Sequence, residues 1–229
     1  MTRLEDRAWI PEAEAWMVRE KTKPLGMDLE TRCQILGTAV DAWAKKEMPR
    51  VAAVIAKDLG YAEPMVLEGF RRMVEAHRQA HLREWVQESR GQDQGVSKTG
   101  QFDRVVGYVV AGNVPGLSVL ALIEGLLSGS AVFLKLPETD QETAPSFLRI
   151  LEAIDSTMAS KVRANYWPGG EREIESVLFP RLDRLFVSGQ ETTIRELQKT
   201  YGEKVEGFGP RYSVAVLEAE PEAGLPSFA

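Results

Sequence analysis

The chain has 229 residues and a formal net charge of −6 at pH 7. This length accommodates one large domain or two small ones around a substantial core. Hydrophobic residues make up 44% and charged residues 27% of the chain, as in ordinary soluble globular proteins. The negative charge disfavours nucleic acid and anionic membranes as partners, because both attract basic faces. With a single cysteine and no apolar signal-peptide core after Met1, we expect a cytoplasmic protein without disulfides.

The first 90 residues are predicted to be helical throughout. A helix over 28–46 begins at the candidate N-cap Asp28, and its apolar residues recur at steps of three and four. A second helix over 49–59 is predicted to stop at Gly60, and a third runs from Pro64 to about residue 89. Each of these helices has one apolar face, so we expect them to pack on a core.

The composition changes at residues 90–101, which are polar and rich in glycine and are predicted to form a linker. Beyond residue 104, short apolar segments alternate with segments of helical periodicity. Strands are predicted at 105–111, 131–135, 162–166, 184–187, 204–207 and 212–217, and helices at 116–128, 143–157, 171–178 and 190–201. This alternation predicts an α/β fold with a doubly wound, mainly parallel sheet.

A membrane span is the alternative interpretation of residues 109–127, which contain Glu124 as their only charge. The sequence G-N-V-P-G interrupts this stretch, and Gly and Pro at such a place are typical of a turn in a soluble fold. We therefore favour a strand, a turn and a helix over a membrane span.

Polar residues follow the first two predicted strands of the sheet. Asn113 comes after the first strand, and Lys135 and Glu138 end the second. Ligands of parallel sheets bind beyond the carboxyl ends of the strands, so these residues predict a site. The Asn113 amide can donate to an oxyanion, or Asn113 can be a turn residue. Lys135 and Glu138 can bind ribose hydroxyls, or Glu138 can serve the start of a helix.

Small residues occupy the turns after two further predicted strands: Gly169, Gly170, Ser188 and Gly189. They allow a backbone to approach a phosphate, although glycine is also the ordinary residue of turns. The chain contains no G-x-G-x-x-G motif, so an ordinary Rossmann dehydrogenase is not supported.

Three further residues are candidates for metal binding or nucleophilic chemistry. His77 and His81 are four residues apart and can share a helix face, but two histidines make at most half of a metal site. We expect them to be solvated or packed and predict no metal. Cys33 lies on the apolar face of a predicted helix, where a free cysteine behaves as a small hydrophobic residue.

Five motifs occur in order along the chain: A-G-N-V-P-G around Asn113, K-L-P-E from Lys135, A-N-Y-W-P-G-G at 164–170, D-R-L-F-V-S-G-Q-E at 183–191 and G-F-G-P-R-Y-S-V-A-V at 207–216. Their order and spacing resemble the aldehyde dehydrogenase superfamily and are most similar to its LuxC-type acyl-CoA reductase branch. The resemblance covers about residues 28 to 218.

The resemblance implies reduction of an acyl-CoA or a similar activated acyl substrate to an aldehyde, with NADP(H) or NAD(H) as cofactor. Asn113 would stabilise the oxyanion of the reaction. The cofactor-binding residues would be Lys135, Pro137, Glu138, Gly169, Gly170, Ser188 and Gly189. NADPH is usual in this branch, whereas a carboxylate at Glu138 favours NAD because it repels a 2′-phosphate.

The chain departs from the family pattern in its catalytic residues. The family's nucleophilic cysteine lies farther along than this sequence extends, and Gly207 stands where the family has a general-base glutamate, with Glu206 one residue away. Neighbouring residues of a strand point to opposite faces, so Glu206 is not expected to substitute. We therefore expect this chain to supply the cofactor pocket and the oxyanion asparagine without the nucleophile.

The expected organisation is a helical segment and linker over 1–100, a dinucleotide-binding α/β domain over 101–218, and a tail over 219–229 that leads toward a catalytic domain. The face that such a domain would cover is expected to promote self-association or homo-oligomers. Two alternatives stay open at this point: a non-catalytic nucleotide- or partner-binding protein, and another activated-acyl reductase such as glutamyl-phosphate reductase.

Overall fold

A computed structural model describes residues 7–90 and 104–210, with side chains described for 7–84 and 104–210. The helices are α1 (Trp9–Thr22), α2 (Leu29–Lys46), α3 (Met48–Leu59), α4 (Glu63–Ala76), α5 (Gln79–Arg90), α6 (Leu117–Leu127), α7 (Thr143–Ile154), α8 (Ser156–Ala159), α9 (Arg172–Leu178) and α10 (Glu191–Tyr201). The strands are β1 (Val105–Val109), β2 (Ala131–Leu136), β3 (Val162–Tyr166), β4 (Arg184–Ser188) and β5 (Val205–Phe208).

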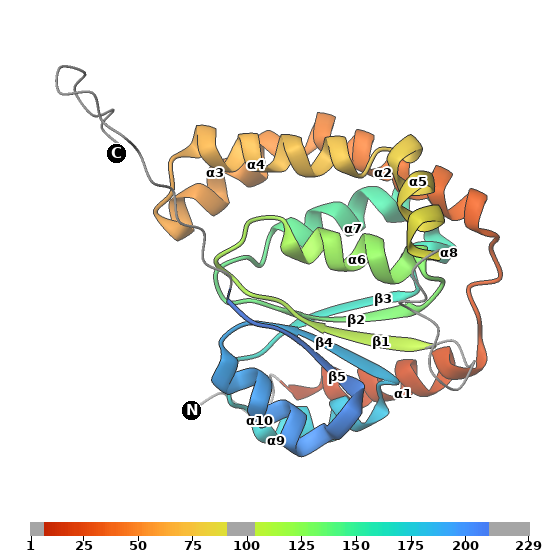
Figure 1. Cartoon of the computed structure of the whole chain (residues 1–229), viewed down its shortest axis with the longest axis vertical. Coiled ribbons are helices and arrows are strands. Elements are labelled where there is room, and N and C mark those ends of the chain that lie inside the picture. Colours follow the sequence, from red (N-terminus) through yellow and green to blue (C-terminus); the bar gives the residue numbers. More distant parts are fainter. Residues whose placement is uncertain (1–6, 91–103, 211–229) are drawn as a thin grey trace.

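The five strands form one parallel sheet in the order β3-β2-β1-β4-β5 (Figure 1). Strand β1 is central, and Tyr108 in it pairs with Leu134 of β2 on one side and with Phe186 of β4 on the other. The chain proceeds outward from β1 in both directions, so the strand order reverses between β1 and β4. In doubly wound sheets the crevice at such a reversal is where ligands bind. The predicted fold class is confirmed.

Helices cover both faces of the sheet (Figure 1). Helices α6 and α7 pack on one face, with α2, α3, α4 and α5 outside them; we call these six helices the upper layer. Helices α1, α9 and α10 form the lower layer on the other face. The alternation of side chains along β2 places Leu134 in the upper core and Phe133 in the lower core.

The N-terminal helices share a core with the sheet. Helix α2 contacts both α6 and α7, and one cluster of buried residues includes Trp43 of α2, Phe70 of α4 and Leu134 of β2. Helix α1 lies on the opposite face, where Trp16 and Met17 are buried beside β1 and α9. The helical segment therefore surrounds the sheet on both sides.

Contacts at the amino edge of the sheet hold α1 in place. Lys161, just before β3, forms a buried ion pair with Glu20 of α1 and donates to the carbonyl of Lys23 at 2.8 Å. The indole of Trp16 donates to the carbonyl of Ser160 at 3.1 Å. These bonds are made where the chain passes from the lower layer to the upper layer.

The predicted helix ends agree with the structure at some positions and differ at others. The Asp28 carboxylate accepts from the backbone N–H of Thr31 at 2.7 Å and caps α2, as predicted. The single helix predicted from Pro64 is two helices, because α4 ends at Ala76. His77 leaves the helical conformation, and its Nδ1 lies 2.8 Å from the Met73 carbonyl oxygen.

The second of these helices, α5, turns back onto α2. Gln79 packs so closely on Gly37 of α2 that a Cβ at that glycine would lie 2.7 Å from the Cβ of Gln79. The predicted strand over 212–217 and the predicted linker beyond Arg90 lie outside the described residues. Among the described helices, none combines the length and the apolar character that a membrane crossing needs.

Candidate functional site

The turn after β1 carries Asn113 at the carboxyl edge of the sheet. Two backbone carbonyls of this turn accept hydrogen bonds from other parts of the chain. Thr139 Oγ1 donates to the Gly112 carbonyl at 2.7 Å, and the Tyr61 hydroxyl donates to the Asn113 carbonyl at 3.4 Å. A Cβ at Gly112 would lie 2.2 Å from Thr139 Oγ1, so the turns after β1 and β2 touch there. Asn113 itself is exposed, and the described residues make no hydrogen bond to its side-chain amide.

The same turn is fixed against the upper layer. Gly116 has φ +84°, and a Cβ there would lie 2.8 Å from the sulfur of Met73 in α4. The buried Asp140 accepts from the backbone N–H of Thr143 at 3.0 Å and from the Ser118 hydroxyl at 3.4 Å. The turns after β1 and β2 are therefore a connected unit whose backbone is held while the Asn113 amide stays accessible.

Lys135, near the end of β2, points to the lower face of the sheet. It is half-buried, and its Nζ lies 5.2 Å from the centroid of the Trp167 ring. Burial lowers the pKa of Lys135, while the negative charges of Glu175 and then Glu138 raise it. Within the described residues, the ammonium has neither a hydrogen bond nor an ion pair, so it is available to a ligand.

Glu138 and Pro137 follow Lys135 but lie in a different environment. Glu138 is exposed in the loop after β2 and forms no ion pair with the described residues; its backbone carbonyl accepts from Gln141 Nε2 at 3.3 Å. Pro137 is buried, and its Cβ would be 3.0 Å from a Cβ at Gly112. The structure brings Lys135 and Glu138 to one edge of the sheet without pairing their charges.

Two residues that the sequence analysis did not select, Trp167 and Glu175, lie beside Lys135. Trp167 is buried between the rings of Trp9 and Phe133, with centroid distances of 5.6 and 5.9 Å. Its indole Nε1 has no hydrogen-bond partner among the described residues. Glu175 of α9 is half-buried; burial is the main cause of its raised pKa, which Lys135 and the Trp167 N–H partly lower again.

The small residues of the predicted phosphate turns lie at the same edge. Gly169 and Gly170 follow β3 and are exposed, and Gly170 has φ +83°. Gly189 follows Ser188 at the end of β4 and donates its N–H to the Phe208 carbonyl at 3.2 Å. A Cβ at any of these glycines would meet no atom within 4 Å, so the space beside each backbone is open.

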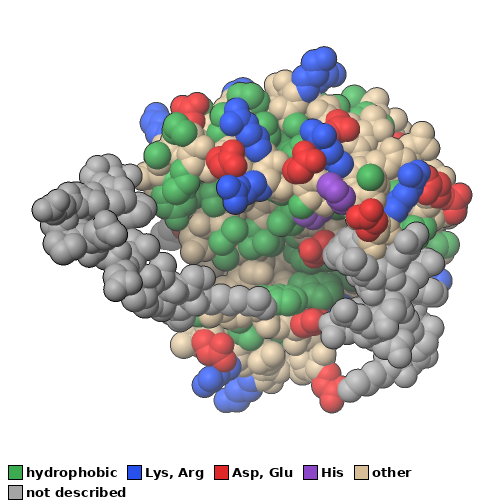
Figure 2. Space-filling model, turned by 45° about the horizontal axis from the view of Figure 1, so that its top comes forward, with side chains coloured by type: hydrophobic (Ala, Val, Ile, Leu, Met, Phe, Trp, Pro, Cys, Tyr) green, Lys and Arg blue, Asp and Glu red, His purple; other side chains and the backbone are tan. Residues whose placement is uncertain are grey.

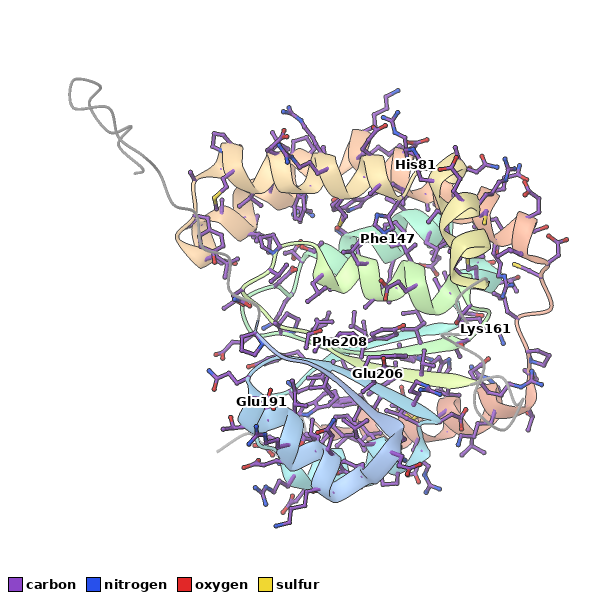
Figure 3. All side chains as sticks on the ribbon, viewed as in Figure 1. His81, Phe147, Lys161, Glu191, Glu206 and Phe208 are labelled. Carbon is purple, nitrogen blue, oxygen red and sulfur yellow. The ribbon has the colours of Figure 1, made fainter. Side chains whose placement is uncertain are left out.

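Strand β5 carries Gly207, which was predicted to replace a general-base glutamate, and its neighbour Glu206. A Cβ at Gly207 would lie 2.2 Å from Cγ2 of Ile194, so this position faces α10 in the lower layer. Glu206 points to the other face, where its Oε2 lies 3.5 Å from Nη1 of Arg184. Figure 3 labels Glu206 and Phe208 on β5. The strand alternation thus separates these two positions, as the sequence analysis expected.

The cysteine and the two histidines lie away from this edge. Cys33 is fully buried in α2, and burial raises the pKa of its thiol. His81 is in α5 and His77 at the end of α4, so they do not share one continuous helix face; Nδ1 of His81 lies 2.7 Å from the Glu75 carbonyl oxygen. Among the described residues, no three His, Cys, Asp or Glu side chains are grouped to hold a metal.

Large apolar side chains are exposed near the Asn113 turn and on β5. Tyr61 is 37%, Met65 55%, Val114 48% and Phe208 45% exposed. In Figure 2, hydrophobic side chains gather in a band across the middle of the face shown, below the charged side chains of the upper helices. Exposed apolar surface of this kind is common where another domain, chain or ligand packs.

Known structures share this fold. The glyceraldehyde-3-phosphate dehydrogenase GapN of Methanocaldococcus jannaschii, complexed with NADP, superposes with a TM-score of 0.61 at 13% identity, over 90% of this chain and 46% of that one. Aldehyde dehydrogenase 21 of Physcomitrella patens, in complex with succinate, gives 0.61 at 15% identity, over 86% and 43%. The chain therefore spans less than half the length of these structures.

A third structure, the NADP-dependent glyceraldehyde-3-phosphate dehydrogenase of Bacillus halodurans, also complexed with NADP, gives a TM-score of 0.59 at 15% identity, over 85% of this chain and 42% of that one. No curated protein matches the sequence significantly. The family model of acyl-CoA reductase (LuxC) matches residues 26–224, which is most of the chain. The chain has an aldehyde dehydrogenase fold, and it belongs to the LuxC family of acyl-CoA reductases.

Proposed function

We propose that this chain binds a nicotinamide dinucleotide at the carboxyl edge of its sheet and supplies the cofactor-binding half of an acyl-CoA reductase. The observation that carries the proposal is the group of unpaired polar side chains and open glycine turns at that edge. Lys135 has no polar partner among the described residues, and the backbones of Gly169, Gly170 and Gly189 are open to the space beside them. Family membership supports the reaction class, and the reversal of strand order between β1 and β4 supports the place.

The residues present fit a dinucleotide. The Lys135 ammonium would donate to the hydroxyls of the adenine-side ribose. Glycines in the turns after β3 and β4, together with Ser188, would allow the pyrophosphate to approach the backbone. The buried, unpaired N–H of Trp167 is a further donor that a bound ligand would satisfy. When bound, the dinucleotide would supply the hydride for the reduction.

Asn113 would act on the acyl substrate. Its side-chain amide would donate to the oxygen of a thioester carbonyl as negative charge develops there, an effect of roughly 10²–10³ in rate for one such donor. The bonds from Thr139 and Tyr61 to the backbone on either side would keep this amide in place. The thiolate that would attack the acyl carbon is not assigned to a residue of this chain, because Cys33 is buried far inside α2.

The preferred nucleotide is proposed to be NAD(H). Carboxylates near Lys135 disfavour a 2′-phosphate by charge repulsion, although two of the similar structures contain NADP. We also propose a cytoplasmic location, since the single cysteine is a buried free thiol. Self-association through the exposed apolar side chains near Asn113 and on β5 belongs to the same proposal.

A non-catalytic function is the second candidate, and Gly207 is the observation that favours it. This position faces α10 and is too crowded for a side chain, so it offers no general base. In that case the chain would bind a nucleotide or a protein partner without turnover. Another activated-acyl reductase, such as glutamyl-phosphate reductase, is a further alternative within the same fold.

A fluorescence titration with NADH and, separately, NADPH tests the proposal. Saturable binding is expected, and Lys135→Ala should weaken it about tenfold or more, because a charge-assisted hydrogen bond is lost. Lys57→Ala, at an exposed lysine of α3, is the matched control and should leave the affinity unchanged. If the folded chain binds neither nucleotide, the proposed function is wrong.

A further inference from the structure

The orientation of Lys135 is the starting point, because it decides which carboxylate shares its environment. Lys135 and Phe133 alternate with Leu134 along β2, so both point to the lower face of the sheet. The lower layer contributes Glu175 from α9, and the charge of Glu175 influences Lys135 more than that of Glu138 does. Glu138 lies in the loop after β2 and is exposed to water, which screens its charge.

Trp167 gives the second, independent observation. Trp167 is 2% exposed, its ring stacks with those of Trp9 and Phe133, and its indole Nε1 has no hydrogen-bond partner among the described residues. Buried N–H groups of proteins are nearly always paired, so this one calls for an acceptor. The carboxyl of Glu175 is close enough for the indole N–H to lower its pKa, yet the two groups do not meet in hydrogen-bond geometry.

Two donors without partners in the described structure therefore lie together beneath the end of β2, because the Lys135 ammonium is 5.2 Å from the ring centroid of Trp167. The half-buried Glu175 of α9 lies within electrostatic reach of both, since each of them lowers its pKa. Their chemistry matches a pair of neighbouring hydroxyls. Each hydroxyl accepts from a donor such as Lys135 or Trp167, and each donates to an acceptor such as Glu175. The adenine-side ribose of a dinucleotide carries such a pair.

We infer that Glu175 and Trp167, together with Lys135, bind the adenine-side ribose, and that Glu175 rather than Glu138 discriminates NADH from NADPH. This inference rests on the proposed function. A 2′-phosphate placed against Glu175 would bring two negative charges together in a partly buried position, where water screens them less than at Glu138. Lys135 would compensate for only part of this repulsion.

Dissociation constants for NADH and NADPH, measured for the full chain by fluorescence titration, test the inference with Glu175→Gln and its matched control Glu138→Gln. The ratio of the NADPH constant to the NADH constant should fall about tenfold or more in Glu175→Gln. It should change less than about twofold in Glu138→Gln. A larger fall in Glu138→Gln, or an unchanged ratio in a folded Glu175→Gln protein, would overturn the inference.

Trp167→Phe provides a second measurement, because it keeps a stacked ring and removes the N–H. It should weaken the binding of NADH and of NADPH by a similar factor, about five- to tenfold, and leave the ratio of their dissociation constants unchanged. Unaltered affinity in this variant would show that the indole does not contact the ligand. If Glu175→Gln does not fold, Glu175→Asp is the alternative, because its shorter side chain withdraws the carboxylate. It should also lower the ratio of the NADPH constant to the NADH constant, and an unchanged ratio would overturn the inference.

The outcomes for this inference and for the proposed function are distinct. A wild-type chain that binds neither nucleotide overturns both. A wild-type chain whose binding depends on Lys135, but whose preference does not respond to Glu175, overturns the inference and leaves the proposed function standing.

Discussion

Two buried tryptophans, one in each layer, differ in whether the indole N–H has a hydrogen-bond partner. In the upper layer the indole of Trp43 donates to the Ser146 hydroxyl at 2.8 Å, inside a cluster of buried apolar side chains. In the lower layer the indole of Trp167 has no partner among the described residues, and Lys135 and Glu175 lie beside it. The buried indole of the upper layer is satisfied within the protein, whereas the lower layer keeps polar groups that have no partner in the described structure.

The largest expected effect concerns the apolar packing of the upper layer. Phe147 of α7 is completely buried there. Phe147→Ala should lower the free energy of unfolding by about 3–5 kcal/mol, because it removes a large buried ring and leaves a cavity. Urea unfolding measures this loss. Phe147→Leu is the control and should cost clearly less; equal losses would mean that ring volume does not determine stability at this position.

The next effect tests whether the lower layer depends on its buried ion pair. The side chains of Lys161 and Glu20 are 9% and 3% exposed. Lys161→Met should cost about 3 kcal/mol, because it leaves the buried Glu20 carboxylate with only the more exposed Arg19, whose Nε lies 2.9 Å from Glu20 Oε1, as an ion-pair partner. The double variant with Glu20→Leu should recover much of that loss, while Lys45→Met on the exposed side of α2 should be nearly neutral. A double variant as unstable as the single one would contradict the argument.

A smaller effect is expected when the Trp43 indole N–H is left without a partner, as the Trp167 N–H is in the described structure. Ser146→Ala removes the acceptor of the Trp43 indole, and the unpaired buried N–H should cost about 1–3 kcal/mol. Chemical denaturation compares it with Ser176→Ala, at an exposed serine of α9. If Ser146→Ala has no more effect than this control, the contrast between the two tryptophans has no energetic meaning.

The smallest expected effect is the pH dependence that Glu175 contributes. Burial raises the pKa of Glu175 above its ordinary value in the folded state, so its ionised form is disfavoured there. Its contribution to stability is therefore most favourable below the ordinary glutamate pKa and decreases as the pH rises through the folded-state pKa. Glu175→Gln should stabilise the protein relative to wild type more at about pH 7 than at about pH 4. Thermal unfolding at both pH values measures this difference, and a reversed sign would mean that Lys135 and Trp167 outweigh the burial of Glu175.

Much of the fold could be predicted from the sequence, because strands and helices each have a characteristic local periodicity of apolar residues. Strands β1 to β4 lie close to their predicted ranges, and Asp28 caps α2 as expected. The break at His77 was missed, since residues 64–89 keep one helical pattern on both sides of it. Two contacts accompany the end of α4: the His77 imidazole bonds to the Met73 carbonyl, and α5 packs on Gly37 of α2. The packing on Gly37 joins residues far apart in the sequence, so it exists only in the folded chain.

The candidate site divides in the same way. Motif order placed Asn113, Lys135 and the glycine turns at one edge, because parallel strands bring their carboxyl ends together. Trp167 was quoted within a motif but given no role, and Glu175 was not selected. Nothing in its local pattern distinguishes Glu175 from the other acidic residues of α9, which include Glu173.

The sequence by itself determined the alternation of strands and helices, the turns that contain glycine, and the residues that end each strand. These features depend on side-chain periodicity and on backbone freedom, both of which are local. Only the tertiary structure decided that α1 covers the lower face, that Gly207 faces Ile194, and that the Lys135 ammonium lies over the ring of Trp167. The physical reason is that such contacts depend on the order of the strands and on the face to which each crossing helix returns.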